Sequence, residues 1–178
     1  MDNKFLDLAI KYANKAYKLD EVPVGAVIVK NNEVIGYGYN KKEKNNSVLD
    51  HAELIAIKKA QKKLNNWRLN GCDIYISLDP CPMCASAIKQ SRIKNVYSAL
   101  NNSNENNLKI ITKIFKKDKT NPEVIFTSNL NPEPVKKMLN SFFKNQRKYW
   151  FVWYNTCEEV LLCIKLYIEN TDLQILKQ

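Results

Sequence analysis

Apolar residues recur every three or four positions near the start of the chain, which is the spacing of one helix face. Over residues 3–18 they are Phe5, Leu6, Ala9, Ile10, Ala13, Ala16 and Tyr17. Two apolar runs follow at residues 24–29 and 34–39, and the Asn31-Asn32 pair between them predicts a hairpin of two strands. The polar residues 41–46 predict a loop after the second strand.

A helical period returns over residues 51–64, and a start signal accompanies it. Asp50 stands at the expected N-cap, and Glu53 three residues later completes a capping box. Further along, we expect strands at residues 73–77, 94–98 and 124–127 and helices at residues 84–91, 104–117 and 134–147. Helices that alternate with single strands favour a layered α/β sheet covered by helices.

The end of the chain differs in character from the rest. Residues 149–154 are densely aromatic, and residues 160–168 are apolar apart from Lys165. Neither run reaches the roughly 20 residues that a membrane-spanning helix needs, so no membrane partner is expected. We interpret this tail as an extra helix packed on the domain, with membrane-surface or partner binding as the alternative. We therefore expect a domain at residues 1–148 and an extension of unknown role at residues 149–178.

The composition of the 178 residues fits one globular domain with an appendage. Hydrophobic residues make up 45% of the chain, which is enough for a core and argues against disorder. The formal net charge of +10 favours an anionic partner, most often nucleic acid. A solvated lysine surface would give the same charge, so the charge alone does not decide the function.

Cysteine usage suggests a reducing environment. The five cysteines are Cys72, Cys81, Cys84, Cys157 and Cys163, an odd count. The start of the chain lacks a signal-peptide pattern, because Lys, Asp and Asn interrupt its apolar positions. We therefore expect a cytoplasmic protein with reduced thiols, in which a close Cys-x-x-Cys pair binds a metal or is redox-active.

The only histidine of the chain opens the sequence His51-Ala-Glu53 at the start of the second expected helix. Downstream, Cys81 and Cys84 stand three apart in the segment Pro80-Cys-Pro-Met-Cys84, between an expected strand and an expected helix. Zinc prefers four tetrahedral nitrogen or sulfur ligands, and a catalytic site leaves one position to water. His51, Cys81 and Cys84 would supply three ligands. Glu53, two residues from a ligand, could take and return the proton of the bound water.

Two other kinds of site also use a Cys-x-x-Cys pair. A structural zinc site would need a fourth ligand, but the chain has no second histidine and its other cysteines lack a matching spacing. A redox pair would leave the His51-x-Glu53 sequence unexplained. The same residues argue against a third alternative, an inactive protein that only binds RNA or acts as a scaffold. Such a protein would have lost a zinc ligand or Glu53, and all four residues are present.

The pattern His-x-Glu followed by Pro-Cys-x-x-Cys is the signature of zinc-dependent nucleobase deaminases. Over residues 1–148 the chain resembles the bacterial tRNA-specific adenosine deaminases, which make inosine at the wobble position of an anticodon. The pieces that carry this resemblance are Glu21-Val-Pro-Val-Gly-Ala26, Gly38-Tyr-Asn40, His51-Ala-Glu53, Asn66-Trp-Arg-Leu69, Pro80-Cys-Pro-Met-Cys84, Ser91-Arg-Ile93 and Phe142-Phe143 followed by basic residues.

The resemblance implies a three-layer α-β-α fold of the cytidine deaminase type, with a central five-stranded mixed sheet. It implies one Zn²⁺ per subunit, a homodimer and a tRNA anticodon loop as the substrate. It also implies that Asn40 hydrogen-bonds the target base or its sugar, and that Val22, Pro23 and Val24 shape the base pocket. Val22 and Val24 are equally credible as strand and core residues.

Three parts of the sequence depart from the family pattern. Asp50 stands where a small residue is usual, Asp79 stands where glutamate is expected, and residues 99–107 replace a loop that helps to hold RNA. A deaminase of a free base or nucleoside, such as guanine deaminase, is therefore the alternative, and Pro82 inside the cysteine pair is common in such enzymes. The net charge and the basic residues within 144–148 favour the RNA substrate.

Overall fold

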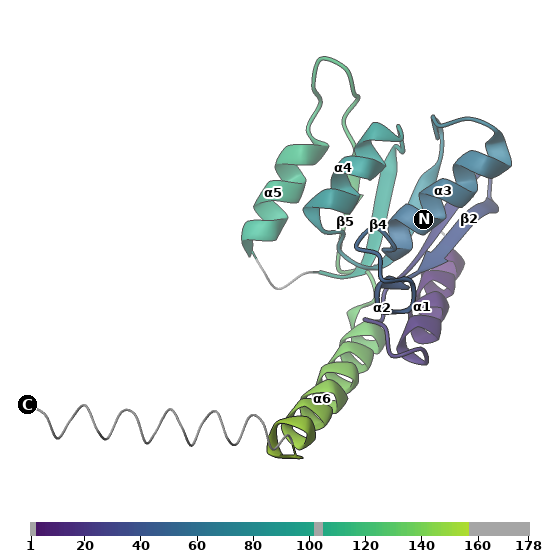
Figure 1. Ribbon diagram of the computed structural model, residues 1–178. Coiled ribbons are helices and arrows are strands. Elements are labelled where there is room, and N and C mark those ends of the chain that lie inside the picture. The colour runs from purple at the N-terminus through teal and green to yellow at the C-terminus, as the bar shows by residue number, and fades with distance from the viewer. Residues whose placement is uncertain (1–2, 102–104, 157–178) are drawn as a thin grey trace, which may run out of the picture. The chain divides into compact units, whose positions relative to one another are not determined.

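A five-stranded mixed sheet forms the centre of the fold, with the strand order β2-β1-β3-β4-β5 (Figure 1). Its strands are β1 (Gly25–Lys30), β2 (Glu33–Tyr39), β3 (Asp73–Leu78), β4 (Asn95–Leu100) and β5 (Ile125–Thr127). β1 pairs antiparallel with β2 and with β3, whereas β3, β4 and β5 run parallel to one another. The three parallel strands therefore end at the same edge of the sheet, and the segments that follow them meet there.

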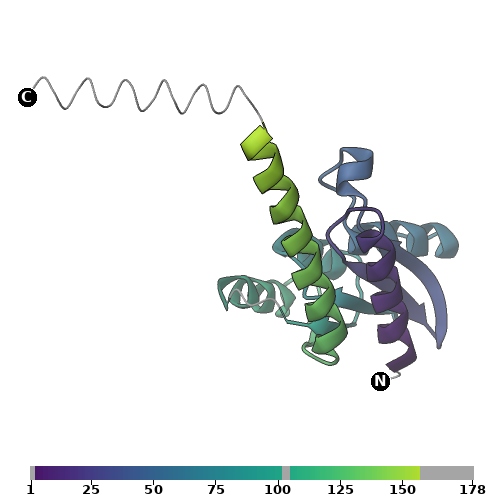
Figure 2. The ribbon, with the colours of Figure 1, turned by 90° about the horizontal axis from the view of Figure 1, so that it is seen from below.

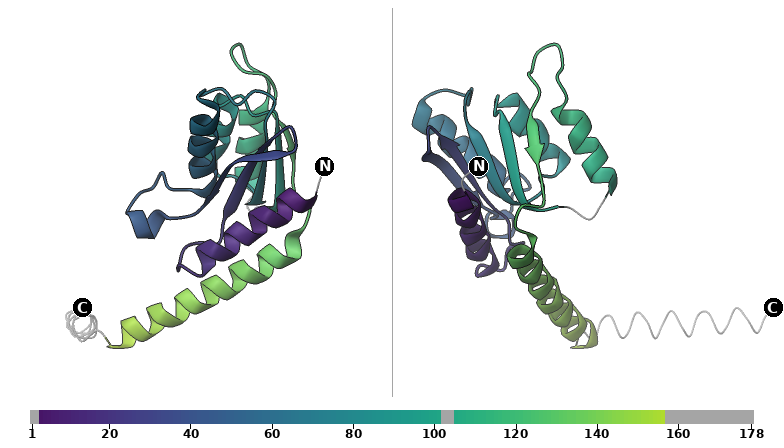
Figure 3. Two further views of the ribbon diagram at one scale, coloured as in Figure 1. Left: turned by 90° about the vertical axis from the view of Figure 1, so that its right-hand side faces the viewer. Right: turned by 180° about the vertical axis from the view of Figure 1, so that it is seen from behind.

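Helices cover both faces of the sheet, which confirms the three-layer arrangement expected from the sequence (Figure 3). The helices are α1 (Asn3–Tyr17), α2 (Lys42–Asn45), α3 (Ala52–Leu64), α4 (Pro82–Gln90), α5 (Glu105–Phe115) and α6 (Pro132–Thr156). α1 and the first turns of α6 pack on one face, and α3, α4 and α5 pack on the other. The short helix α2 lies where the sequence indicated a loop.

Strand β1, which lies between β2 and β3, shows why the sheet needs two hydrophobic faces. Ala26 and Ile28 belong to the core cluster under α3 and α4, whereas Val27 and Val29 belong to the cluster under α1. A strand that is buried on both faces reads as a continuous apolar run, as residues 24–29 do. The hairpin turn is also as predicted, because Asn31 and Asn32 both have positive φ, 48° and 64°, as a type I′ turn requires.

The strand β2 lies directly against α3 because glycines face the helix. A Cβ on Gly38 would lie 2.1 Å from the carbonyl oxygen of Ala52, and one on Gly36 would lie 2.4 Å from that of Ala56. No side chain fits between the two backbones at these positions. The end of β2 is therefore held next to the start of α3.

This computed structural model describes residues 3–101 and 105–156. They fall in two compact units, Met1–Asn140 and Ser141–Gln178, and the sheet lies in the first. The last helix was expected over residues 134–147, but α6 extends to Thr156 and includes the aromatic residues 149–154. The expected apolar run at residues 160–168 lies outside the described residues. Among the residues that are described, none of the helices combines the length and the apolar character needed to cross a membrane.

Candidate metal centre

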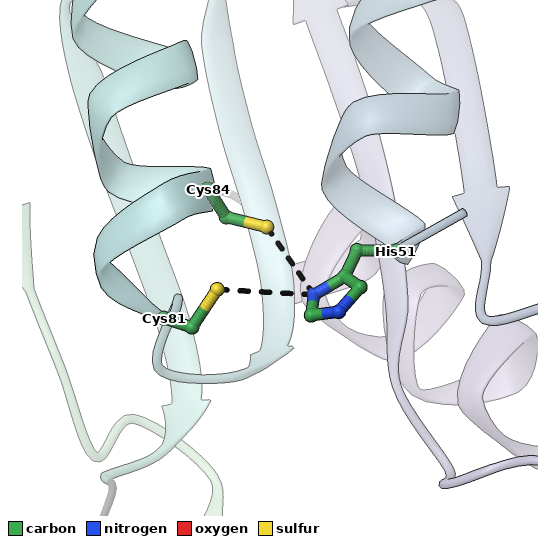
Figure 4. Close-up of side chains that lie close together, drawn as sticks. All are labelled: His51, Cys81 and Cys84. Carbon is green, nitrogen blue, oxygen red and sulfur yellow. Dashed lines mark hydrogen bonds between the residues drawn. The ribbon is translucent and has the colours of Figure 1, made fainter. Parts of the chain in front are cut away.

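Three side chains that the sequence singled out converge at the ends of two helices (Figure 4). The Nδ1 atom of His51 lies 3.5 Å from the Cys84 sulfur and 3.8 Å from the Cys81 sulfur. The ligand atoms of the three residues all lie within 4.8 Å of one another. His51 comes from the start of α3, whereas Cys81 and Cys84 come from the start of α4.

These donors fit a zinc ion. A tetrahedral ion with Zn–S bonds of about 2.3 Å and Zn–N bonds of about 2.0 Å places nitrogen and sulfur roughly 3.5 Å apart. The distances of 3.5 Å and 3.8 Å from His51 are close to this value. Among the described residues, no fourth His, Cys, Asp or Glu joins the cluster. A site of three protein ligands is the catalytic type, in which the fourth position is open to water or substrate.

The cysteine turn places both sulfurs at a helix N-terminus. β3 ends at Leu78, and α4 begins at Pro82 with Cys81 as its N-cap residue. Proline suits the first helical position because it lacks the N–H that would otherwise have no partner there. A hydrogen bond from the Cys84 thiol lowers the pKa of Cys81 to about 4, and the same hydrogen bond raises the pKa of Cys84. Cys81 is therefore a thiolate at neutral pH, ready to bind a cation.

Asp79 fixes this turn to the neighbouring strands. Its backbone N–H donates to the carbonyl oxygen of Leu100, at 3.0 Å. Its carboxylate accepts hydrogen bonds from the hydroxyls of Ser98, in β4, and of Ser128, which follows β5, the latter at 2.6 Å. The ends of the three parallel strands are thus joined two residues before the first cysteine ligand. Sequence reasoning noted Asp79 only as a departure from the family pattern, because both serines are distant in the chain.

Glu53 lies in the first turn of α3 with 3% of its surface exposed. Its Oε2 atom is buried and has no hydrogen-bond partner among the described residues. Burial raises the pKa of this carboxyl to about 6. A buried carboxylate oxygen without a partner is costly, and in a native site it indicates a group that the protein binds there.

The start of α3 is capped by a residue that the sequence did not indicate. The expected N-cap at Asp50 is wrong: the N-cap position is His51, and the Asp50 carboxylate instead accepts a hydrogen bond from Asn45, at 2.6 Å. The amide oxygen of Asn40 accepts the hydrogen of the Ala52 backbone nitrogen, at 2.9 Å. The expected capping box fails because the helix begins one residue later, which leaves the His51 imidazole free to face the cysteines.

Asn40 also reaches the segment that the sequence assigned to the base pocket. Its Nδ2 group donates to the carbonyl oxygen of Val22, at 3.0 Å. Pro23 and Val24 are buried, and Val24 belongs to the main core cluster, whereas Val22 is only partly buried. The structure therefore brings Asn40 and Val22 together beside the start of α3. Their contact with a base stays a prediction.

A further buried acid, Glu21, was not recognised from the sequence. It is 1% exposed, and its carboxylate accepts hydrogen bonds from the backbone nitrogens of Lys44, at 2.9 Å, and Glu43, at 3.3 Å. It thereby holds α2 to the segment at residues 22–24. The available signal was an acidic residue directly before an apolar run, but its partners lie more than 20 residues away.

Comparison with known proteins places the chain in a family. Residues 1–100 match the family described as the cytidine and deoxycytidylate deaminase zinc-binding region. The tRNA-specific adenosine deaminase of Bacillus subtilis is 35% identical over 147 residues, which are 83% of this chain and 91% of that protein. A solved structure from work on A-to-I editing by tRNA:A34 deaminases has a TM-score of 0.70 at 31% identity, over 78% of this chain and 100% of that chain.

Guanine deaminase from Bacillus subtilis is also similar, with a TM-score of 0.57 at 30% identity over 83% of this chain and 95% of that chain. The likeness to both proteins extends well beyond the zinc ligands, and the family match contains His51, Glu53, Cys81 and Cys84. By its sequence, its fold and its three-ligand site, this chain belongs to the cytidine and deoxycytidylate deaminase family, which carries a zinc-binding region.

Proposed function

We propose that this chain is a zinc-dependent hydrolase that converts adenosine to inosine at the wobble position of tRNA. The observation that carries deamination is the buried Oε2 atom of Glu53, which has no hydrogen-bond partner among the described residues. Glu53 lies two residues from the histidine of a three-ligand metal centre. The similarity to a tRNA-specific adenosine deaminase across 91% of its length supports the choice of substrate.

We assign one zinc ion per subunit to His51, Cys81 and Cys84. When bound, zinc supplies a Lewis acid that lowers the pKa of water in the open position towards about 7. Glu53 is the proton carrier, because it is close to the ligands and is not one of them. Its pKa of about 6 lies near neutrality, so it can both accept and release a proton during turnover.

The reaction exchanges an amino group for an oxygen atom. Water adds to C6 of adenine while the Glu53 carboxylate takes one proton from it and delivers it to N1 of the ring. Glu53 then takes a second proton, from the hydroxyl now on C6, and passes it to the amino group; the bond from C6 to nitrogen breaks, the C6 oxygen becomes a carbonyl, and ammonia and inosine result. Every proton that Glu53 accepts is returned within one turnover, so the residue ends as a carboxylate.

The residues of the substrate site are proposed from their place beside α3. Asn40 uses one amide hydrogen and one lone pair of its oxygen inside the protein, so one hydrogen and one lone pair remain for a base or sugar. Val22, Pro23 and Val24 would form the wall against which the base packs. Proteins usually recognise single-stranded RNA through bases that are turned out of a loop. A base turned out in this way could enter a pocket beside the start of α3.

The family resemblance also supports a homodimer that acts in the cytoplasm on a tRNA anticodon loop. We propose residues 1–148 as the deaminase domain and residues 149–178 as an extension of unknown role. The net charge of +10 and the lysines of residues 41–44 suit a polyanionic partner better than an uncharged base. Deamination of free guanine is the second candidate, and the similarity to the guanine deaminase from Bacillus subtilis favours it.

The two candidates can be separated in one experiment. The zinc-loaded protein is incubated with total tRNA and, separately, with guanine; the tRNA is then sequenced for A-to-I changes, and ammonia release is followed from guanine. We expect inosine at a wobble adenosine and no ammonia from guanine, with Glu53→Gln as the inactive control. Fast, salt-insensitive ammonia release from guanine without inosine in tRNA would instead identify a free-base deaminase.

A further inference from the structure

β2 is an outer strand of the sheet, with no further strand beside it in the described structure (Figures 1 and 2). Two tyrosines of β2 and one of α1 stack there. The rings of Tyr12, in α1, and Tyr37, in β2, are 4.8 Å apart between centroids and within 9° of parallel. The ring of Tyr39 lies 6.3 Å from that of Tyr12, within 6° of parallel. Their planes therefore point the same way, as the bases of a stacked single strand do.

Each of these tyrosines carries a lysine ammonium over its ring. Lys59, in α3, lies 3.6 Å from the centroid of Tyr37, and Lys41 and Lys15 lie 4.9 Å and 5.0 Å from those of Tyr39 and Tyr12. We call these six residues the tyrosine–lysine edge. The lysines come from α1, α3 and the segment after β2, so three separate parts of the chain bring positive charge to one row of rings.

The charge of this edge is not neutralised within the described part of the chain. Salt bridges between described residues join Lys63 to Glu33 and Lys89 to Asp118, and none of them involves a lysine of the edge. Lys63 makes the contrast clear, because it lies one turn beyond Lys59 on α3 and pairs with an acid at 2.5 Å. Lysines alone would protect an edge strand from pairing, but stacked rings are not needed for that purpose.

The edge is also accessible and close along the chain to the proposed substrate residues. Tyr37 is 41% exposed, and Lys15 and Lys59 are exposed. Tyr39 and Lys41 flank Asn40, whose side chain caps the helix that carries the zinc histidine. A strand that leaves the metal centre past the end of β2 therefore meets Tyr39 and Lys41 before Tyr37 and Lys59.

We propose that the tyrosine–lysine edge binds an unpaired stretch of the RNA strand that carries the deaminated nucleotide. Bases stack on Tyr37 and Tyr39, and Lys15, Lys41 and Lys59 move from the rings to the phosphates. Proteins that bind single strands combine aromatic platforms with a positively charged track in this way. This inference rests on the proposed function, because it assumes that the substrate is RNA.

The test compares variants of the edge with matched variants elsewhere. Tyr37→Leu removes the ring, and Tyr37→Phe keeps it. Tyr97→Leu is the control, because Tyr97 stacks on Tyr75 at 4.9 Å and no lysine of the described residues lies over the Tyr97 ring. Lys59→Gln is compared with Lys63→Gln on the same helix. Each zinc-loaded protein is assayed on an anticodon stem-loop RNA, and its affinity is measured against salt in the Glu53→Gln background. Zinc content and melting temperature serve as checks of folding.

We expect Tyr37→Leu to raise the KM for RNA about 5- to 100-fold with little change in kcat, and Tyr37→Phe to restore the wild-type KM. Lys59→Gln should reduce the slope of log affinity against log salt by about 1, whereas Lys63→Gln and Tyr97→Leu should leave KM and slope unchanged. If Tyr37→Leu keeps the wild-type KM and Lys59→Gln keeps the wild-type salt slope while inosine is still formed, the tyrosine–lysine edge does not bind the RNA. The proposed function would then stand.

A wild-type protein that binds the RNA without forming inosine would refute the proposed function. The RNA affinities of the same variants would still test whether the tyrosine–lysine edge binds RNA. A wild-type protein that does not bind the RNA at all would overturn both.

Discussion

The amide oxygen of Asn40 accepts the backbone hydrogen of Ala52, at 2.9 Å, across 12 residues of sequence. The same side chain donates to the carbonyl oxygen of Val22. One buried asparagine thus sets the spacing between the segment at residues 22–24 and the helix that carries His51. The metal centre and the proposed base site are positioned relative to each other through this one side chain.

Asn40→Ala should lower both stability and activity. It leaves the Ala52 N–H and the Val22 carbonyl without their partner, which we expect to cost about 1–3 kcal/mol of the free energy of unfolding. Denaturant unfolding of the zinc-loaded protein measures this loss. Asn45→Ala is the control, because its hydrogen bond to Asp50 is exposed to solvent. A variant with wild-type stability and a raised KM alone would show that Asn40 acts only on the substrate.

Removing any one ligand should empty the metal centre. His51→Ala, Cys81→Ala and Cys84→Ala each leave two donors, and a three-ligand site cannot lose one and hold zinc. We expect less than one zinc ion per ten chains by elemental analysis, against one per chain in the wild type. Cys72→Ala is the matched control, because Cys72 is buried away from the cluster. Full zinc content in any ligand variant would mean that the ligands are misassigned.

Glu53→Gln should separate catalysis from stability. The substitution keeps the zinc ligands and removes the proton carrier, so turnover should fall by about 10² to 10⁴-fold with normal zinc content. Because one buried oxygen of this carboxylate has no hydrogen-bond partner in the described part of the chain, the neutral amide should leave the melting temperature unchanged or raise it. Near-normal turnover in this variant would remove Glu53 from the mechanism.

Glu21→Ala should loosen α2 and weaken RNA binding. The variant leaves the backbone N–H groups of Glu43 and Lys44 without their acceptor, at an expected cost of about 1–3 kcal/mol. We expect a higher KM for tRNA and normal zinc content, because α2 carries no metal ligand. Glu43→Ala is the control, since it removes an exposed acid and keeps the backbone donor. If the two variants behave alike, the buried carboxylate of Glu21 does not position α2.

A chain that ends at Lys148 should remain folded, bind zinc and keep its activity. The core clusters of the described residues draw on residues 5–139, so the truncation removes none of their members. Gel filtration, zinc analysis and the tRNA assay measure the three properties. An insoluble product would show that the aromatic residues 149–154 cover an apolar surface of the domain.

Local patterns determined most of what could be predicted. The hairpin depends on Asn31 and Asn32, and the cysteine pair lies within one turn of one helix, so neighbouring residues are enough to recognise each. The five strands were predicted from the sequence with ends that differ from the observed ones by no more than two residues. Buried strands such as β1 stand out because an unbroken apolar run ends at the polar residues 30–32.

Contacts between distant residues were out of reach. Asp50 has the right chemistry and position for an N-cap, but the helix begins after His51, and Asn40 supplies the acceptor from another segment. The partners of Asp79 are separated from it by 19 and 49 residues. No periodicity in the sequence reports such pairs, because they depend on how the strand ends meet. The length of α6 was underestimated because its aromatic part lacks a helical apolar pattern.

His51 is the only histidine in the chain, and its Nδ1 atom faces the two sulfurs. The protein therefore carries a spectroscopic label of its own at the metal centre. Each imidazole proton gives one resonance in an NMR spectrum of the whole chain, so no assignment by mutagenesis is needed. Titrating the metal-free protein with zinc while following that signal therefore measures the fraction of chains that hold the metal, without any substitution.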